Sequence, residues 1–327
     1  MNKERFYLFD NLKGLMIFFV VFGHLLAFCP EEEFIVKNLY FWIYSFHMPV
    51  FVFTTGYFGK YNKTKIKNSL LYPYIIFSIF YYVFKILVLN KTGITIFTVP
   101  YHHLWYLPSS ICWYLTIPFI EKNINKKNLL MICSIIFMLL AGYIPLFGRF
   151  LSLSRTICFY PFFLLGYMCK KIDKSKFLQI IQNKKFKITM IVLFTVVSII
   201  FFSGSLDFLK RSMLYYTSNY KSMDSNIFHR LQILCFNFIG IGFFVSCVPN
   251  KRLSCITHFG QNTIYIFLLH DFITGWIGKT HILKNIQFPI TISFVLAILI
   301  TVITVLPIVK KTTTPFIIYK NNKKQET

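Results

Sequence analysis

Three ionisable residues stand in one apolar segment near the start of the chain, "LFDNLKGLMIFFVVFGHLL" from Leu8 to Leu26. On a helix, the step from Lys13 to His24 is three turns plus about 20°, and Asp10 falls about 40° from His24. All three therefore share one face. Lys13 and Asp10 are expected at the inner membrane interface. There they either take part in function or only anchor the helix at the lipid head groups. His24 is expected roughly 16 Å further on, near mid-depth, where an ionisable group is a functional candidate that can pass a proton.

Two further histidines are expected at similar depth on other segments. His47 stands in "YSFHMPVFVFTTGYF" at 44–58, where Pro49 frees the backbone carbonyl of Ser45. His270 stands in "THFGQNTIYIFLLHDF" at 257–272. Its neighbour Asp271 is expected on another face and is not paired with it. Each histidine alone is equally compatible with a packing or hydrogen-bonding role and with a functional one, and two at one depth favour the functional role.

An aromatic and basic group is expected on the outer side. The stretch "PYHHLWYLPSS" at 100–110 places His102 and His103 beside Trp105 and Tyr106, and these rings form either an interfacial belt or a platform for a sugar ring. The stretch "FGRFLSLSR" adds two cations that bind a phosphate or carboxylate of a substrate, or lipid head groups. These cations are Arg149 and Arg155.

Composition places these residues in a membrane protein. The 327 residues are 56% hydrophobic and 20% aromatic, with a mean hydropathy of +0.59, which exceeds what a soluble core of this size needs. We expect one domain over 1–327, an all-α integral membrane bundle of about ten transmembrane helices. The ten apolar stretches are 12–29, 35–58, 69–89, 104–120, 129–147, 156–169, 188–206, 230–249, 261–278 and 286–308.

The net charge of +24 would suggest a nucleic-acid partner in a soluble protein, but its distribution indicates topology instead. With an inner N-terminus, 24 basic residues fall on inner segments and ten on outer ones, and Lys85 near the outer end of the third span can reach the outer interface. The positive-inside rule then places both termini in the cytoplasm, and no nucleic acid is expected as a partner. The eight cysteines lack metal-ligand spacing, so no metal is expected.

Five stretches, in order, give the chain a resemblance to a known family. "FDNLKGLMIFFVVFGH", "YSFHMPVFVFTTGY", "HLWYLP", "SRTICFYPFFLLGYMCK" and "GQNTIYIFLLH" resemble landmarks of the membrane-bound acyltransferase family 3, in particular its fucose 4-O-acetylase-like and saccharide O-acetyltransferase branch. The family's first landmark is a basic residue, ten residues, then histidine. Lys13 and His24 fill it here, although arginine is more common at the first place.

The resemblance implies an enzyme of the bacterial cytoplasmic membrane that transfers an acyl group, usually acetyl, from acyl-coenzyme A to a carbohydrate hydroxyl at the cell envelope. His24 would be the general base or would carry the acetyl group itself. His47 would orient His24 or stabilise the oxyanion, and Asp10 would pair with Lys13. Asn262 and His270 would have supporting roles.

The substrates are assigned to opposite sides. The phosphates of acetyl-coenzyme A would bind basic residues of the cytoplasmic side, namely Lys13, Lys60 and Lys63. The carbohydrate acceptor would bind the outer group, namely Trp105, Tyr106, His103, Arg149 and Arg155.

Two other classes of function remain open from the residues alone. A proton-coupled carrier or flippase for a lipid-linked sugar would also use histidines at depth and outer aromatic residues. The absence of a detectable inverted repeat in the sequence speaks against it. A scaffold or receptor has no need of such histidines.

Overall fold

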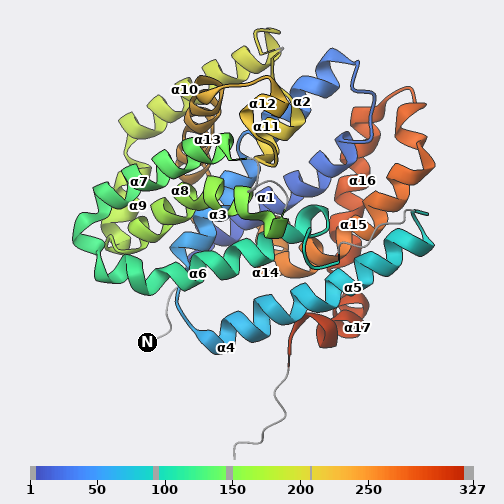
Figure 1. The fold of residues 1–327 in the computed structure, drawn as a ribbon, viewed down its shortest axis with the longest axis horizontal. Coiled ribbons are helices and arrows are strands. Elements are labelled where there is room, and N and C mark those ends of the chain that lie inside the picture. Colours follow the sequence, from blue (N-terminus) through green and yellow to red (C-terminus); the bar gives the residue numbers. More distant parts are fainter. Residues whose placement is uncertain (1–4, 91–95, 145–149, 207, 320–327) are drawn as a thin grey trace, which may run out of the picture.

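The computed structural model describes residues 5–90, 96–144, 150–206 and 208–319. Over these ranges the regular structure is helical, with no strand (Figure 1). The α-helices are α1 (Tyr7–Leu26), α2 (Phe34–Tyr44), α3 (His47–Tyr57), α4 (Lys63–Ile66), α5 (Tyr72–Leu87), α6 (Tyr106–Lys122), α7 (Lys127–Leu140), α8 (Leu153–Lys170), α9 (Lys174–Gln182), α10 (Lys184–Phe202), α11 (Arg211–Tyr215), α12 (Tyr220–Met223), α13 (Ile227–Cys247), α14 (Ser254–Gln261), α15 (Thr263–Thr280), α16 (Pro289–Thr304) and α17 (Pro307–Ile317). A short 3₁₀-helix, η2 (His102–Trp105), precedes α6.

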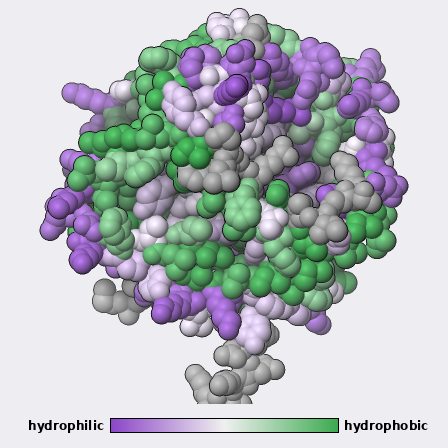
Figure 2. Space-filling model, in the orientation of Figure 1, coloured by the Kyte–Doolittle hydropathy of each residue, from purple (hydrophilic) through white to green (hydrophobic). Residues whose placement is uncertain are grey.

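Several of these helices are suited to a lipid environment. Six are long and apolar enough to cross a membrane, or seven if the bent pair α16 and α17 forms one span, counted over the described residues. Large apolar side chains are exposed on α5, α7, α10 and α16, and Figure 2 shows hydrophobic atoms across the middle of the viewed face, with polar atoms gathered over α11 and α12. Apolar exposure on this scale belongs in lipid. The ten-span topology and the cytoplasmic termini remain predictions.

The expected second span, 35–58, is broken into α2 and α3. Pro49 has no N–H to donate to the carbonyl of Ser45, so the helix ladder is interrupted there. Nδ2 of Asn237, from α13, donates to that carbonyl at 2.5 Å instead. The break therefore leaves no unpaired carbonyl at Ser45, and it places His47 at the first position of α3.

Helix α1 runs through the middle of the bundle, with 72% of its apolar window buried, against 17% for α10. It contacts α14, α16, α3 and α15. Its inner end is held by Asn11, which donates to the carbonyls of Pro249 and Lys251 at 2.9 Å each and accepts from Thr257 at 2.6 Å. These contacts fix the helix that carries Lys13 and His24.

Helices α1 and α14 approach each other closely at two glycines. A Cβ added to Gly260 would lie 1.7 Å from the backbone oxygen of Asp10, and one added to Gly14 would lie 2.0 Å from that of Ile256. Neither backbone atom can turn aside as a side chain would. Only glycine therefore permits this spacing of the two helices.

Replacing Gly260 with alanine should destabilise the bundle by about 1–3 kcal/mol, the usual cost of overpacking a tight contact. Thermal unfolding of the purified protein in detergent would measure it. Gly242→Ala is the matched control, because its new methyl group would meet the sulfur of Met190, the flexible end of a side chain. Equal melting temperatures for the two variants would contradict this account of the α1–α14 contact.

Candidate active site

A cavity of about 590 Å³ lies among α1, α2, α3, α5, η2, α8, α11 and α15. This volume is within the range of sites for small molecules. Its wall combines aromatic and aliphatic side chains with an unusual number of ionisable ones. The ionisable residues of the wall, tyrosines apart, are His24, His47, Lys85, His102, His103, Arg155, Arg211 and Asp271.

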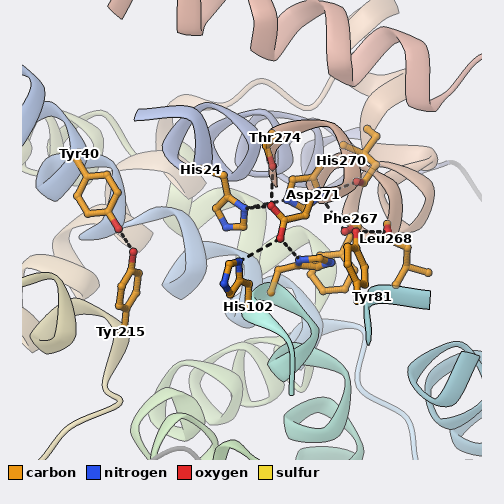
Figure 3. A network of polar contacts seen from close by, with 12 residues as sticks. His24, Tyr40, Tyr81, His102, Tyr215, Phe267, Leu268, His270, Asp271 and Thr274 are labelled. Atoms are coloured by element: carbon orange, nitrogen blue, oxygen red, sulfur yellow. Dashed lines mark hydrogen bonds and ion pairs between the residues drawn. The ribbon is translucent and has the colours of Figure 1, made fainter. Parts of the chain in front are cut away.

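The carboxylate of Asp271 is the centre of this group (Figure 3). Oδ1 accepts a hydrogen bond from Oγ1 of Thr274 at 2.6 Å and lies 3.5 Å from Nδ1 of His24. Oδ2 lies 3.3 Å from Nδ1 of His103 and 3.4 Å from Nδ1 of His102. A carboxylate that is 1% exposed must be compensated in this way, because an unpaired buried charge is costly.

His270 completes the arrangement around His24. Its Nδ1 faces the carbonyls of Ile266 and Phe267 at 2.9 Å each, so Nδ1 carries the proton of the neutral ring. Its Nε2 is then an acceptor, and it lies 3.2 Å from Nδ1 of His24. His24 must therefore donate through Nδ1, toward both His270 and Asp271.

This tautomer leaves the other nitrogen of His24 as a base. No partner of Nε2 is found among the described residues, and the side chain is 19% exposed at the cavity wall. A histidine with one nitrogen held by a carboxylate and the other presented to a cavity is the arrangement of a general base or nucleophile. The residues thus supply a proton acceptor and a group that stabilises its protonated form.

His24 stands in the last turn of α1, so it lies near one end of its helix and not near the middle. The helix begins at Tyr7, earlier than expected, because Asp10 and Asn11 are paired inside the protein. The helix ends at Leu26. Pro30 follows four residues later, and a proline disfavours the helical conformation at the residue before it.

Asp271 is the residue of this candidate site that sequence reasoning missed. Adjacent residues on a helix are about 100° apart, which was the reason for separating Asp271 from His270. In the structure the His24 ring lies between the side chains of His270 and Asp271, so that both reach its Nδ1. A carboxylate inside an otherwise apolar helix was the available signal.

Only some of the residues expected to bind the acceptor on the outer side line the cavity. His103, Trp105 and Arg155 line it, with the Arg155 guanidinium 5.1 Å from the centre of the Trp105 ring. His103 was expected at the surface, but its side chain is 3% exposed and contacts Asp271. Tyr106 does not line the cavity and bonds with Thr55 in the interior. Arg149 lies outside the described residues.

His47 lines the same cavity, and its hydrogen bond does not go to His24. Its Nδ1 donates to the carbonyl of Ile43 at 2.8 Å, so the neutral ring presents a lone pair at Nε2. Such a ring cannot donate a hydrogen bond to an oxyanion. The contacts that orient His24, a role expected of His47, come from Asp271 and His270.

The remaining candidates lie near the start of α1, away from the cavity. Nζ of Lys13 is 3.1 Å from Asp10, which also accepts from Arg5 at 2.7 Å, and Nζ of Lys13 faces the ring of Phe58. Lys60 and Lys63 follow Phe58 and are exposed. Asn262 bonds with Lys310 at the start of α15. By helical rise, Lys13 and His24 are roughly 16 Å apart.

Ligand atoms for a metal ion also meet at this site. One atom each from His24, His270 and Asp271 lies within 4.8 Å of the others. Two imidazoles and a carboxylate are ligands that zinc accepts. The direct contact between His24 and His270, however, already joins a donor to an acceptor, so the pair is satisfied without an ion.

Comparison with known proteins agrees with this chemistry. A family model described as an acyltransferase domain, that of acyltransferase family 3, matches residues 6–309, which include every residue of the cavity wall named above. No significant match was found among curated proteins or among solved structures. Because the match covers nearly the whole chain, the protein belongs to acyltransferase family 3.

Proposed function

We propose that this protein transfers an acetyl group from cytoplasmic acetyl-coenzyme A to a hydroxyl of a cell-surface or exported polysaccharide, or of its lipid-linked precursor, in the bacterial inner membrane. The observation that supports it most is Nε2 of His24, a base without a partner among the described residues, at the wall of a cavity large enough for a sugar. The family supplies the reaction type, acyl transfer.

In the proposed reaction, Nε2 of His24 removes the proton of the acceptor hydroxyl as its oxygen attacks the thioester carbonyl. The tetrahedral intermediate collapses, the carbon–sulfur bond breaks, and the sulfur of coenzyme A leaves with the proton that His24 took up. Asp271 stabilises the imidazolium between these two transfers. The products are the O-acetyl ester and free coenzyme A.

The alternative route uses the same nitrogen as a nucleophile. Nε2 attacks the thioester carbonyl, the carbon–sulfur bond breaks, and coenzyme A leaves as the thiolate, which gives an acetyl-imidazolium beside Asp271. The acceptor hydroxyl then attacks the acetyl carbonyl, its proton passes to the thiolate, and Nε2 is released unprotonated. Both routes require an unprotonated Nε2, which the contacts of Nδ1 provide.

The donor is proposed to approach from the end of the bundle that carries Lys13. The phosphates of coenzyme A cannot enter hydrocarbon, and this end presents Lys13 together with the exposed Lys60 and Lys63. The long, largely uncharged pantetheine arm would then cover the roughly 16 Å between Lys13 and His24 along α1.

The decisive experiment measures cleavage of the thioester by the protein in nanodiscs. With acetyl-coenzyme A and a glycan extract from the bacterial envelope, we expect release of coenzyme A and a mass increase of one acetyl group on the glycan. A carrier or flippase would bind or move the sugar without consuming acetyl-coenzyme A. Absence of thioester cleavage with every envelope fraction would therefore refute the proposed function.

A further inference from the structure

One proton transfer has no base in the route that uses His24 as the nucleophile. Once Nε2 of His24 carries the acetyl group, it has no lone pair with which to remove the proton of the acceptor hydroxyl. Nδ1 of the same ring is turned toward His270 and Asp271. A second base at the cavity wall would complete this route, and the other histidines of the wall are the candidates.

Among the described residues, three other histidines line the cavity, namely His47, His102 and His103. His47 directs Nδ1 at a backbone carbonyl, so no carboxylate would stabilise its protonated ring. His103 contacts Asp271, but its side chain is only 3% exposed and its Nε2 is buried. A group that takes a proton from a substrate must be reachable from the cavity, and this leaves His102.

His102 combines exposure to the cavity with contact to a carboxylate. Its side chain is 64% exposed at the cavity wall, and its Nδ1 lies 3.4 Å from Oδ2 of Asp271 (Figure 3). Because the carboxylate is an acceptor, Nδ1 carries the proton of the neutral ring and Nε2 keeps its lone pair. No partner of this Nε2 is found in the described part of the chain. His102 therefore presents to the cavity a base of the same kind as His24.

Ring stacking holds His102 in this position despite its exposure. Its ring lies on that of Tyr101, with ring centres 4.3 Å apart, and Tyr101 lies on Tyr81 at 4.5 Å. Tyr81 in turn stacks on Phe272 of α15 at 4.1 Å. The stack and the contact with Asp271 both join η2 to α15. The imidazole of His102 is therefore fixed at the wall, as a group that acts on a bound substrate must be.

A single carboxylate joins the two rings. Nδ1 of His24 lies 3.5 Å from Oδ1 of Asp271, and Nδ1 of His102 lies 3.4 Å from Oδ2. The two histidines differ in exposure, at 19% for His24 and 64% for His102. The more enclosed ring suits an acyl group that must be kept from water, whereas the more exposed ring suits a hydrophilic acceptor.

We propose that His102 is a second catalytic base, which removes the proton of the acceptor hydroxyl while His24 carries the acetyl group. This inference rests on the proposed function and selects its nucleophile route. The hydroxyl oxygen attacks the acetyl carbonyl, the carbon–nitrogen bond to His24 breaks, and Nε2 of His102 takes the proton. The imidazolium of His102 then gives this proton to the thiolate of coenzyme A, which restores both rings.

The test follows the two half-reactions separately, with the protein in nanodiscs. Acetyl-coenzyme A alone should release about one coenzyme A per protein in a rapid burst, the kinetic sign of an acyl-enzyme, and leave the acetyl group on the protein. The acetylated protein is then discharged either with the envelope glycan extract or with hydroxylamine. Hydroxylamine is a strong nucleophile that needs no base, so it reports the reactivity of the acetyl group alone.

His102→Ala should keep the rate and the size of the burst but slow transfer to the glycan by roughly 10²–10⁴-fold, the range for loss of a general base. Discharge by hydroxylamine should stay at the wild-type rate. Added imidazole should restore part of the transfer, because the side chain that it replaces is exposed at the cavity. His258→Ala is the matched control, since His258 is exposed on α14 and does not line the cavity.

The substitution is expected to leave the fold intact. The hydrogen bond from Arg155 is accepted by the backbone carbonyl of His102, which alanine retains. Equal melting temperatures would check this, and His102→Gln, which is polar but not a base, should give the same kinetic result. In His24→Ala both the burst and the transfer should be lost, because His102 then has no acetyl group to act beside.

Three results would overturn the inference. A burst that slows together with the transfer would mean that His102 only holds Asp271 in place. Transfer within a few-fold of wild type in folded His102→Ala would mean that another group takes the proton. Wild-type transfer without a burst would mean that His24 itself is the base. In all three cases the wild-type protein still cleaves acetyl-coenzyme A with the glycan, whereas failure of the proposed function is seen as absent cleavage.

Discussion

Replacing His24 with alanine is expected to lower acetyl transfer by at least about 10³-fold, toward the upper range for loss of a general base. The variant removes Nε2, which takes the proton in one route and the acetyl group in the other. The neighbouring groups are poor substitutes, since His270 directs Nε2 at His24 itself and His103 is buried. Release of coenzyme A and acetylation of the glycan, measured together in nanodiscs, would check this result.

The matched control is His258→Ala. His258 is exposed on α14 and does not line the cavity, so transfer should continue at the wild-type rate. Equal amounts of protein in the membrane and equal melting temperatures would show that His24→Ala still folds. Transfer within a few-fold of wild type in a folded His24→Ala protein would refute the role of His24.

Replacing Asp271 with asparagine should lower kcat by roughly 10²–10⁴-fold, as expected when a base loses the carboxylate that sets its tautomer. Asparagine keeps the size of the side chain but removes the charge that stabilises the imidazolium of His24. Its amide can also present N–H groups to Nδ1, which would move the ring proton to Nε2 and abolish the base. Because Asp271 acts through His24, it is a positioning residue.

A division between kcat and KM distinguishes this role from a merely structural one. The KM for acetyl-coenzyme A should stay near its wild-type value, and Asp271→Glu should recover part of kcat because it restores a carboxylate. Asp224→Asn is the control, since Asp224 is exposed in a left-handed conformation that asparagine also adopts. A variant with reduced affinity for acetyl-coenzyme A and unchanged kcat would contradict the assignment.

The effects of replacing His24 and Asp271 on the rate of transfer should not be independent. If Asp271 works only through His24, the double variant should be no slower than His24→Ala alone, because the first loss removes the group that the second would affect. Multiplicative losses would instead mean that Asp271 contacts the substrate or acts by another route.

Much of the helical arrangement follows from local chain chemistry. Apolar stretches separated by short polar breaks predict helices, and the shared face of Asp10, Lys13 and His24 follows from 3.6 residues per turn. The location of helix ends was less predictable. The break after Tyr44 depends on Pro49 but also on Asn237, which compensates the carbonyl of Ser45 from a distant helix.

The sequence by itself determined that His24 is an ionisable residue in an apolar helix, and that Lys13 stands on the same face three turns away. Only the tertiary structure decided which groups surround His24. The polar partners of His24 come from α15, and Asp271 is in turn contacted from η2. Both elements are far along the chain from α1, and hydrogen bonds of about 3 Å depend on how helices pack rather than on residue spacing. Asp271 became part of the site because α15 is rotated so that His24 falls between two adjacent side chains.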